Sequence, residues 1–260
     1  MPELPDVEHF RRFLVDRAAG ALIERVVTTD PAILRNATDG ALDAAVRGHR
    51  FEEPERHGKW LLAWTTGPAV LVHFGMTGRL IWAPGPAGRH RHDRVIFQTD
   101  RGELRYRNMR KLGGVWLAHD RDEARRLLAP LGPDALHAPA RTFRAALGRR
   151  RGQVKAALMN QSVVAGVGNL AADEALWQAR IHPLRRLEDL TEEERRRLER
   201  SVRRVLRTWV DRFHDLPPGW LLSVRGPGAR CPRCGTELRR TVAGGRTTYF
   251  CPSCQTYTRA

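Results

Sequence analysis

Short hydrophobic runs characterise the first half of the chain. Between about residues 22 and 118 the sequence contains WLLAW, AVLVHF, RLIWA, RVIFQT, ELRYR and GVWLA, separated by glycine, proline and charged residues. Short or alternating apolar runs bounded by turn residues are typical of β-strands. The pattern predicts a β-rich domain here, either a sandwich or a flattened barrel.

A helix is predicted before the first strand, over residues 5–19. Its apolar positions follow helical spacing: Val7, Phe10, Leu14 and Ala18. Asp6 is placed to cap the N-terminus of this helix, and Gly20 follows its end. The chain is therefore expected to begin with a short exposed tip that leads into a helix.

The hydrophobic period becomes helical after a proline- and glycine-rich hinge at about residues 130–140. The clearest of the helices within residues 141–215 opens at Thr191, where Thr191 and Glu194 form a capping box. A second linker, PPGW to RGPGAR, leads to a cysteine-rich tail. The pattern predicts a multidomain α+β protein with a β-sandwich and leading helix over residues 1–130, a helical domain over 131–225 and a small metal-binding domain over 226–260.

The excess of basic residues indicates a polyanionic partner. Lysine and arginine number 45 against 29 acidic residues in a chain of 260, which gives a formal net charge of +16. Phosphate backbones attract such a protein through long-range steering and counterion release. A GC-rich genome would explain arginine in place of lysine, but not basic in place of acidic residues. We therefore expect nucleic acid as the partner.

The sequence does not predict a membrane protein. No apolar stretch approaches the length of a membrane span, and residues 1–20 are too charged for a signal peptide. We expect a monomer in the bacterial cytosol or nucleoid, with no membrane partner.

Four cysteines form two CxxC pairs near the end of the chain, at Cys231, Cys234, Cys251 and Cys254. Two such knuckles at this separation fit a zinc ribbon in which four thiolates share one tetrahedral ion. Two disulfides are the alternative, but they require an oxidising compartment that nothing else in the sequence indicates. A site with four protein ligands leaves no position for substrate, so the zinc is predicted to be structural. The ribbon would present Arg239, Arg240 and Arg246 to phosphate.

A glycine-rich turn, Gly166-Val167-Gly168-Asn169, lies between two amphipathic stretches in residues 153–183. Backbone N–H groups near a helix N-terminus favour a phosphate. A plain packing corner between two helices would show the same pattern, so this motif alone leaves both interpretations open.

The N-terminal sequence Met1-Pro2-Glu3-Leu4-Pro5 offers a nucleophile. Removal of methionine before the small Pro2 would leave a secondary amine beside the Glu3 carboxylate, and an α-amino group is partly unprotonated near neutral pH. Glu3 could then move protons. From the residues alone, prolines that stiffen the approach to the first helix are the favoured interpretation of this motif.

The order of motifs resembles the formamidopyrimidine-DNA glycosylase and endonuclease VIII family. PELPDVE, HGKWLL, VHFGMTGRL, GVGN and a four-cysteine ribbon follow one another over nearly the whole chain. The resemblance implies an N-terminal β-sandwich, a helix-two-turn-helix domain and a C-terminal zinc finger. It also implies damaged DNA as the substrate and a bifunctional DNA glycosylase and AP lyase of base excision repair.

The resemblance implies a role for each matching residue. Pro2 is the expected nucleophile at C1′ of the sugar and Glu3 the expected general acid and base. Lys59 matches the lysine that approaches the phosphate of the lesion. Asn169 and Arg246 match residues that clamp the phosphates beside the flipped nucleotide, and Lys155 is counted with them as DNA-binding. Phosphate contacts position the strand but do not read its sequence.

An amine cannot reach the glycosidic carbon inside stacked duplex DNA, so the nucleotide must be flipped out. The resemblance implies that Met76 fills the space left behind, and that Arg110 and Leu112 lie in the loop that wedges into the opposite strand. Without the family, Met76 would be interpreted as a core residue, and His73 is interpreted as a structural histidine. The iminium then allows successive loss of the 3′ and 5′ phosphates without an added metal or cofactor.

Several positions depart from the better-known members of the family. They are Asp6, Leu112, the pair Asn108-Met109 and Ala171. The segment from about residue 214 to 230 is also shorter than the loop that caps the flipped purine in the 8-oxoguanine enzymes. These differences favour oxidised pyrimidines, ring-opened purines or abasic sites over 8-oxoguanine.

Two other functions remain as alternatives. A non-catalytic protein that binds damaged or abasic DNA could use the same scaffold, although Pro2 and Glu3 are both intact. An RNA-binding or ribosome-associated module would account for the ribbon and the charge, but not for the N-terminal motif.

Overall fold

The computed structural model describes residues 2–213 and 215–257, and these residues form two compact units. One unit contains Pro2 and Asp6–Ala129; the other contains Glu3–Pro5 and the chain from Pro130 onward. Glu3 and the first two residues of the first helix, Leu4 and Pro5, therefore pack with the second unit, although the rest of that helix packs with the first.

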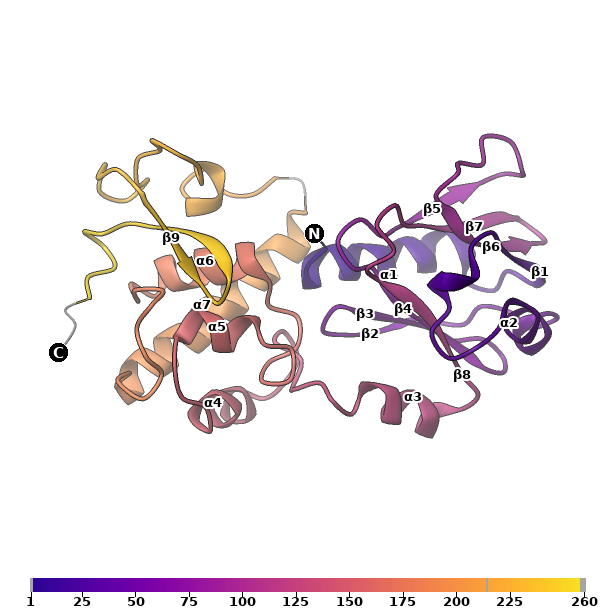
Figure 1. The fold of residues 1–260 in the computed structure, drawn as a ribbon, viewed down its shortest axis with the longest axis horizontal. Helices are drawn as coiled ribbons and strands as arrows, with labels where there is room; N and C mark the ends of the chain where they lie inside the picture. Colours follow the sequence, from indigo (N-terminus) through magenta and orange to yellow (C-terminus); the bar gives the residue numbers. More distant parts are fainter. Residues whose placement is uncertain (1, 214, 258–260) are drawn as a thin grey trace. The chain divides into compact units, whose positions relative to one another are not determined.

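The first unit is a β-sandwich, as the hydrophobic pattern predicts (Figure 1). One antiparallel sheet has the order β1 (Ile23–Thr28), β6 (Asp93–Thr99), β7 (Gly102–Arg107) and β5 (Arg79–Ala83). The other has the order β2 (Glu55–His57), β3 (Trp60–Ala63), β4 (Ala69–His73) and β8 (Gly114–Ala118). The unit also contains all but the first two residues of α1 (Leu4–Ala18), together with η1 (Pro31–Ile33), α2 (Asp39–Val46) and α3 (Arg121–Leu128).

The main core of this unit draws on both sheets and on α1. Strand residues buried in it are Leu61, Val70, Val72, Val95, Phe97, Leu104 and Tyr106. Val7 and Leu14 of α1 join them, and the ring of Phe10 lies 4.4 Å from that of Phe74. Burial of each large apolar side chain contributes roughly 1.5–3 kcal/mol. A second cluster joins Leu71 of β4 to Ala124 of α3, so β4 is buried on both faces and does not alternate.

The first helix begins earlier than expected. It starts at Leu4, so Asp6 lies in its first turn and not at the N-cap, which corrects the sequence prediction. The Leu4 N–H donates to the carbonyl of Gly166 at 3.2 Å. A carbonyl far away in the sequence therefore satisfies a backbone donor that a capping side chain could otherwise have satisfied.

The second unit contains α4 (Ala140–Gly148), α5 (Val154–Met159), α6 (Asn169–Gln178) and α7 (Glu192–Asp211). The capping box of Thr191 and Glu194 is present at the start of α7. Helix α6 is buried along most of its length and contacts α5, α7, η2 (Leu221–Ser223) and β10 (Arg246–Phe250). It is the central element of this unit.

The C-terminal segment forms an antiparallel hairpin of β9 (Arg239–Ala243) and β10. A small apolar cluster joins it to the helices: Trp177 of α6 and Leu221 pack with Cys231, Leu238 and Cys251. Among the described helices, none combines the length and apolar character that a membrane span requires.

Candidate active site and nucleic-acid interface

Glu3 is fixed at the N-terminus of α6. Its Oε1 accepts the N–H of Leu170 at 2.8 Å, and its Oε2 accepts the N–H of Ala171 at 3.1 Å. Helix α6 begins after Gly168, which has no side chain to cap it. The carboxylate of Glu3 therefore acts as the cap from a distant part of the sequence and benefits from the positive end of the helix dipole.

Glycines of the GVGN turn allow this close approach. A Cβ at Gly168 would collide with the Glu3 carboxyl group, and a Cβ at Gly166 would collide with the side chain of Leu4. Gly166 also has a φ of +111°, a conformation that other residues rarely adopt. The turn thus packs closely against Glu3 and Leu4, in addition to the role as a phosphate site that the sequence suggests.

Pro2 is half-buried and directly precedes Glu3. Met1, whose removal the expected chemistry requires, lies outside the described residues. Glu3 itself is only 1% exposed. A proline amine here would have a fixed carboxylate as its covalent neighbour, an arrangement suited to proton transfer.

Lys155 is fully buried, unlike the DNA-contacting residue that the sequence predicts. Its Nζ lies 2.5 Å from Asp173 Oδ1 and donates to Asn169 Oδ1 at 2.7 Å and to Thr248 Oγ1. The ammonium group therefore has three polar partners within the protein, one by ion pairing and two by hydrogen bonds. Burial lowers the pKa of Lys155, and the charge of Asp173 opposes that effect. Its geometry therefore suits the positioning of Asn169 better than direct contact with phosphate.

Asn169 and Arg246 are connected through the hairpin. Asn169 Nδ2 donates to the carbonyl of Thr247 at 3.2 Å, and Thr248 Oγ1 donates to the carbonyl of Arg246 at 3.0 Å. Asn169 is half-buried and Arg246 is exposed. The structure thus brings the predicted residues Glu3, Asn169 and Arg246 to one region of the second unit.

Lys59 lies in the first unit, in the turn between β2 and β3. It acts electrostatically on His73 at the end of β4: burial lowers the pKa of His73 to about 4, and the charge of Lys59 contributes. The His73 imidazole is therefore neutral at physiological pH. Trp60 packs beside it, with ring centroids 5.2 Å apart.

Met76 and Arg110 are neighbours, because Arg110 Nη1 lies 3.1 Å from Met76 Sδ. Thr77 links their loops: its Oγ1 accepts the Arg110 N–H and donates to Asn108 Oδ1, both at 3.0 Å. Leu112 on the second loop is 54% exposed. The two loops that Thr77 links thus carry the three residues predicted to act on the duplex together: Met76, Arg110 and Leu112.

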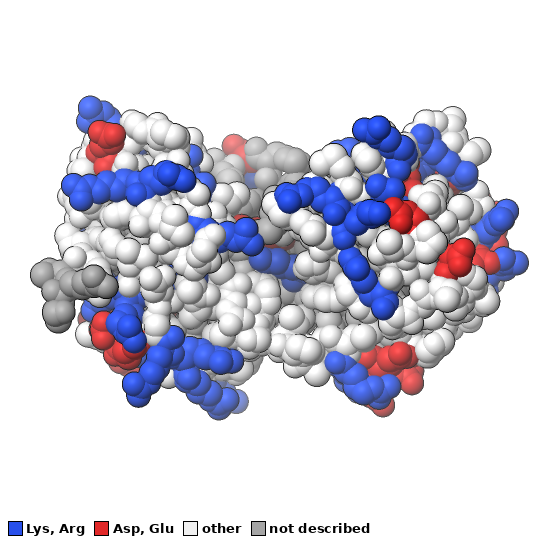
Figure 2. All heavy atoms as spheres, viewed as in Figure 1, with Lys and Arg blue, Asp and Glu red and all other residues white. Residues whose placement is uncertain are grey.

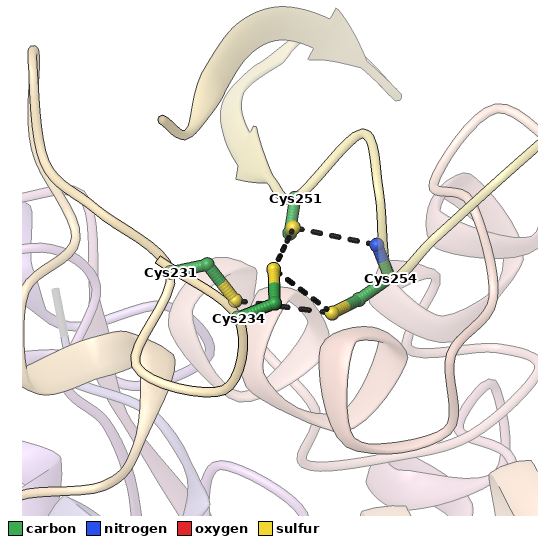
Figure 3. Close-up of side chains that lie close together, drawn as sticks. All are labelled: Cys231, Cys234, Cys251 and Cys254. Atoms are coloured by element: carbon green, nitrogen blue, oxygen red, sulfur yellow. Dashed lines mark hydrogen bonds between the residues drawn. The ribbon is translucent and has the colours of Figure 1, made fainter. Parts of the chain in front are cut away.

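The four cysteines form a closed metal site (Figure 3). Their thiol groups point toward one another, and all four sulfur atoms lie within 4.8 Å of one another. That spacing fits four ligands about 2.3 Å from one zinc ion. Trp177 of α6 donates its indole N–H to Cys231 Sγ at 3.3 Å, which links the site to the helices. The residues fit one structural zinc ion.

Basic side chains extend over the visible face of both units, consistent with a polyanionic partner (Figure 2). Sequence reasoning missed several residues that organise the site, above all Asp173, Arg225 and Thr248. A signal was present for Asp173, since an acidic pair inside the otherwise apolar segment LAADEALW of α6 requires buried partners. Arg225 lies in a linker and Thr248 in a strand, and neither position indicates a role.

Comparison with known proteins agrees with this architecture. Residues 1–115 match the model of the formamidopyrimidine-DNA glycosylase N-terminal domain, residues 131–214 that of the H2TH domain, and residues 228–256 that of the zinc finger found in FPG and IleRS. The formamidopyrimidine-DNA glycosylase of Symbiobacterium thermophilum is 40% identical over 273 residues, covering 98% of this chain and 89% of that protein. That of Heliobacterium modesticaldum is 40% identical and covers 98% and 100%.

Solved structures show the same fold. A complex of wild-type Lactococcus lactis Fpg with DNA containing N7-benzyl-Fapy-dG has a TM-score of 0.89 at 29% identity, covering 98% of this chain and 100% of that one. The same enzyme bound non-covalently to DNA with an AP site has a TM-score of 0.89 at 28% identity, with the same coverage.

A β-sandwich, an H2TH domain and a four-cysteine zinc finger define a DNA glycosylase of base excision repair, in the class of enzymes that combine glycosylase and AP lyase activities. The chain belongs to the formamidopyrimidine-DNA glycosylase family.

Proposed function

We propose that this glycosylase removes an oxidised base through an imine formed by Pro2, followed by β,δ-elimination. The observation that carries the proposal is the position of Glu3, whose carboxylate is fixed on two amides of α6 directly beside Pro2. A general acid and base needs such a defined position relative to the nucleophile.

The expected steps conserve atoms and charge. The Pro2 amine attacks C1′, the C1′–N bond breaks, and the base leaves with a proton. The sugar ring opens to give an iminium, and Glu3 protonates the ring oxygen. Loss of a C2′ proton then expels the 3′ phosphate, and a second elimination expels the 5′ phosphate. Water hydrolyses the remaining imine and regenerates the amine.

DNA contacts are proposed for the two groups of residues described above. Lys59, Asn169 and Arg246 would bind phosphates of the damaged strand. Met76, Arg110 and Leu112 would occupy the space left by the flipped nucleotide. We assign Lys155 to the positioning of Asn169, because it is fully buried and its ammonium group already has three polar partners within the protein.

Ring-opened purines and oxidised pyrimidines are the proposed substrates, in preference to 8-oxoguanine. The names of the relatives and the Fapy-containing complex of the Lactococcus lactis enzyme support the ring-opened purine. The segment before the zinc finger supports the preference against 8-oxoguanine, because Trp220 and Leu221 are buried there and leave little of that segment to cap a flipped 8-oxoguanine. We further propose three functional parts, residues 1–130, 131–225 and 226–260, in a monomeric cytosolic enzyme.

Borohydride trapping tests the mechanism. The purified protein, with its N-terminus verified by mass, is incubated with a duplex containing one abasic site, alongside Pro2→Gly and Glu3→Gln. We expect a covalent adduct that weakens in the Pro2 variant, and loss of strand cleavage in the Glu3 variant. No adduct from a correctly trimmed protein that still binds the site would identify a non-catalytic damage-binding protein instead.

A further inference from the structure

Asp173 lies at the centre of a buried network that none of the proposed chemistry uses. It is 1% exposed. Its carboxylate contacts two cations, the buried Lys155 and the half-buried Arg225. Lys155 contacts its Oδ1 at 2.5 Å, and Arg225 Nε donates to its Oδ2 at 2.8 Å. Burying these charges costs solvation free energy, and removal of one partner would leave the others buried without a compensating charge. The position of Asp173 therefore fixes the positions of Lys155 and Arg225.

The network reaches three separate parts of the chain. Arg225 comes from the linker after η2, and its Nη2 also donates to the carbonyl of Thr247 at 2.8 Å. The N–H of Tyr249 in β10 donates to Asp173 Oδ2 at 3.3 Å, and the Arg225 guanidinium stacks over the Tyr249 ring at 4.9 Å. Asp173 therefore connects α6 with the linker and with the hairpin strand.

Lys155 transmits this arrangement to the proposed phosphate ligands. Its ammonium donates to Asn169 Oδ1, which leaves Asn169 Nδ2 facing the carbonyl of Thr247 with one N–H available. It also donates to Thr248 Oγ1, whose hydroxyl donates to the carbonyl of Arg246. One ammonium group thus determines both the orientation of the Asn169 amide and the backbone position of Arg246.

We propose that Asp173 is a positioning residue which, through Lys155 and Arg225, holds Asn169 and Arg246 together as one preorganised phosphate clamp. This inference rests on the proposed function, because it takes Asn169 and Arg246 to be the phosphate ligands. Asp173 itself touches no DNA. Its contribution is to restrict the conformations of Asn169 and Arg246 before DNA binds. Preorganised ligands bind more tightly because less conformational entropy is lost on binding.

Equilibrium binding to a duplex with a tetrahydrofuran abasic analogue tests the proposal, because this probe lacks the aldehyde and cannot form an imine. We expect Asp173→Asn to weaken binding at least about tenfold and to reduce the slope of log affinity against log salt by about one, the same reduction that we expect for Arg246→Gln. Lys155→Met should have the same effect, and the double variant should be no worse than either single variant, because both act through one network.

The pH dependence of Asp173→Asn provides a readout that a general structural defect would not move. Burial lowers the pKa of Lys155, and Arg225 adds to this effect, whereas the charges of Asp173 and Glu3 oppose it. Without the Asp173 charge the Lys155 ammonium loses its proton at a lower pH, and the clamp loses a donor. We therefore expect the affinity of this variant, relative to the wild type, to fall further as the pH rises from about 6 to 9.

The outcomes separate the two proposals. If Arg246→Gln leaves the salt slope unchanged, the phosphate assignment fails, and the clamp with it. If Arg246→Gln lowers the slope but a folded, zinc-loaded Asp173→Asn binds like the wild type, only the role of Asp173 is wrong. Should Asp173→Asn not fold, Thr248→Val decides, since it breaks the link to Arg246 without removing a charge: a reduced slope supports the clamp, and a wild-type slope overturns it.

Discussion

Gly168 lies so close to the Glu3 carboxyl group that no Cβ fits between them. The backbone of Gly168 has φ −113° and ψ −166°, an extended conformation open to any residue. The glycine is therefore required by the neighbouring carboxylate and not by its own backbone. One position in the GVGN turn thus controls where the proposed general acid and base can lie.

Gly168→Ala is expected to reduce strand cleavage at an abasic site by about 100-fold, because a displacement near 1 Å of a catalytic group has an effect of that size. Gly219→Ala is the matched control, since a Cβ there meets nothing within 4 Å. Single-turnover cleavage and thermal unfolding are measured for both. Cleavage at the wild-type rate in Gly168→Ala would show that the position of Glu3 does not limit the reaction.

Removal of zinc is expected to abolish tight DNA binding while leaving imine chemistry at Pro2 intact. The ribbon has few apolar contacts beyond the cluster around Trp177, and structural zinc contributes about 10–16 kcal/mol to the folding of small zinc domains. The chelated protein should bind a tetrahydrofuran duplex at least about 100-fold more weakly, yet still be trapped by borohydride at high concentrations of abasic DNA. Metal analysis should give one zinc per chain. Binding that survives chelation but is lost on reduction would instead indicate disulfides.

Local spacing was sufficient to predict much of this architecture. Short apolar or alternating runs bounded by turn residues predicted the strands of the sandwich, because each strand and its turn are local features. The Thr191–Glu194 capping box is present because it depends on residues three apart. The two CxxC pairs predicted the ribbon for the same reason, since each knuckle is local. In each of these features the interacting residues lie within one short stretch of chain.

The interior of the second unit could not be predicted in this way. Asp173 meets Arg225 across 52 residues and Tyr249 across 76, and no local period encodes such pairs. The start of α1 was misplaced for a related reason: its first N–H is satisfied by Gly166, far away in sequence. The burial of Lys155 against the Asp173 carboxylate could not be predicted either, because lysines are usually exposed and the partner lies outside any local pattern.

Leu112→Ala is expected to slow removal of a base-paired lesion by about tenfold and to have little effect on cleavage at an abasic site. A wedge residue helps to meet the cost of unpairing, which is a few kcal/mol for a paired base and least for a site already unpaired. Met109→Ala is the matched control, because Met109 lies on the same loop with 55% exposure against 54% for Leu112. The ratio of the two rates is measured for each variant. An equal loss on both substrates would argue against a wedge role for Leu112.

Glu174 should make the folded state less stable as the pH rises from about 5 to 7. Burial raises its pKa to about 7 from 4.5, although hydrogen bonds from Gln178 and from the N–H of Leu222 oppose this effect. Between these two pKa values the Glu174 carboxyl group is ionised in the unfolded chain but still protonated in the folded protein. The stabilisation of the folded state by this proton is therefore complete below pH 4.5 and is lost as the pH rises through 7.

The total loss is about 3 kcal/mol, since one unit of pKa corresponds to about 1.4 kcal/mol. Glu174→Gln cannot titrate, so its free energy of unfolding should decline less steeply over this range than that of the wild type. Glu192→Gln, which changes an exposed carboxylate, should follow the wild type. Denaturant unfolding at pH 5, 6, 7 and 8 measures the difference, and a constant offset between wild type and Glu174→Gln at all four values would mean that Glu174 is already ionised at pH 5.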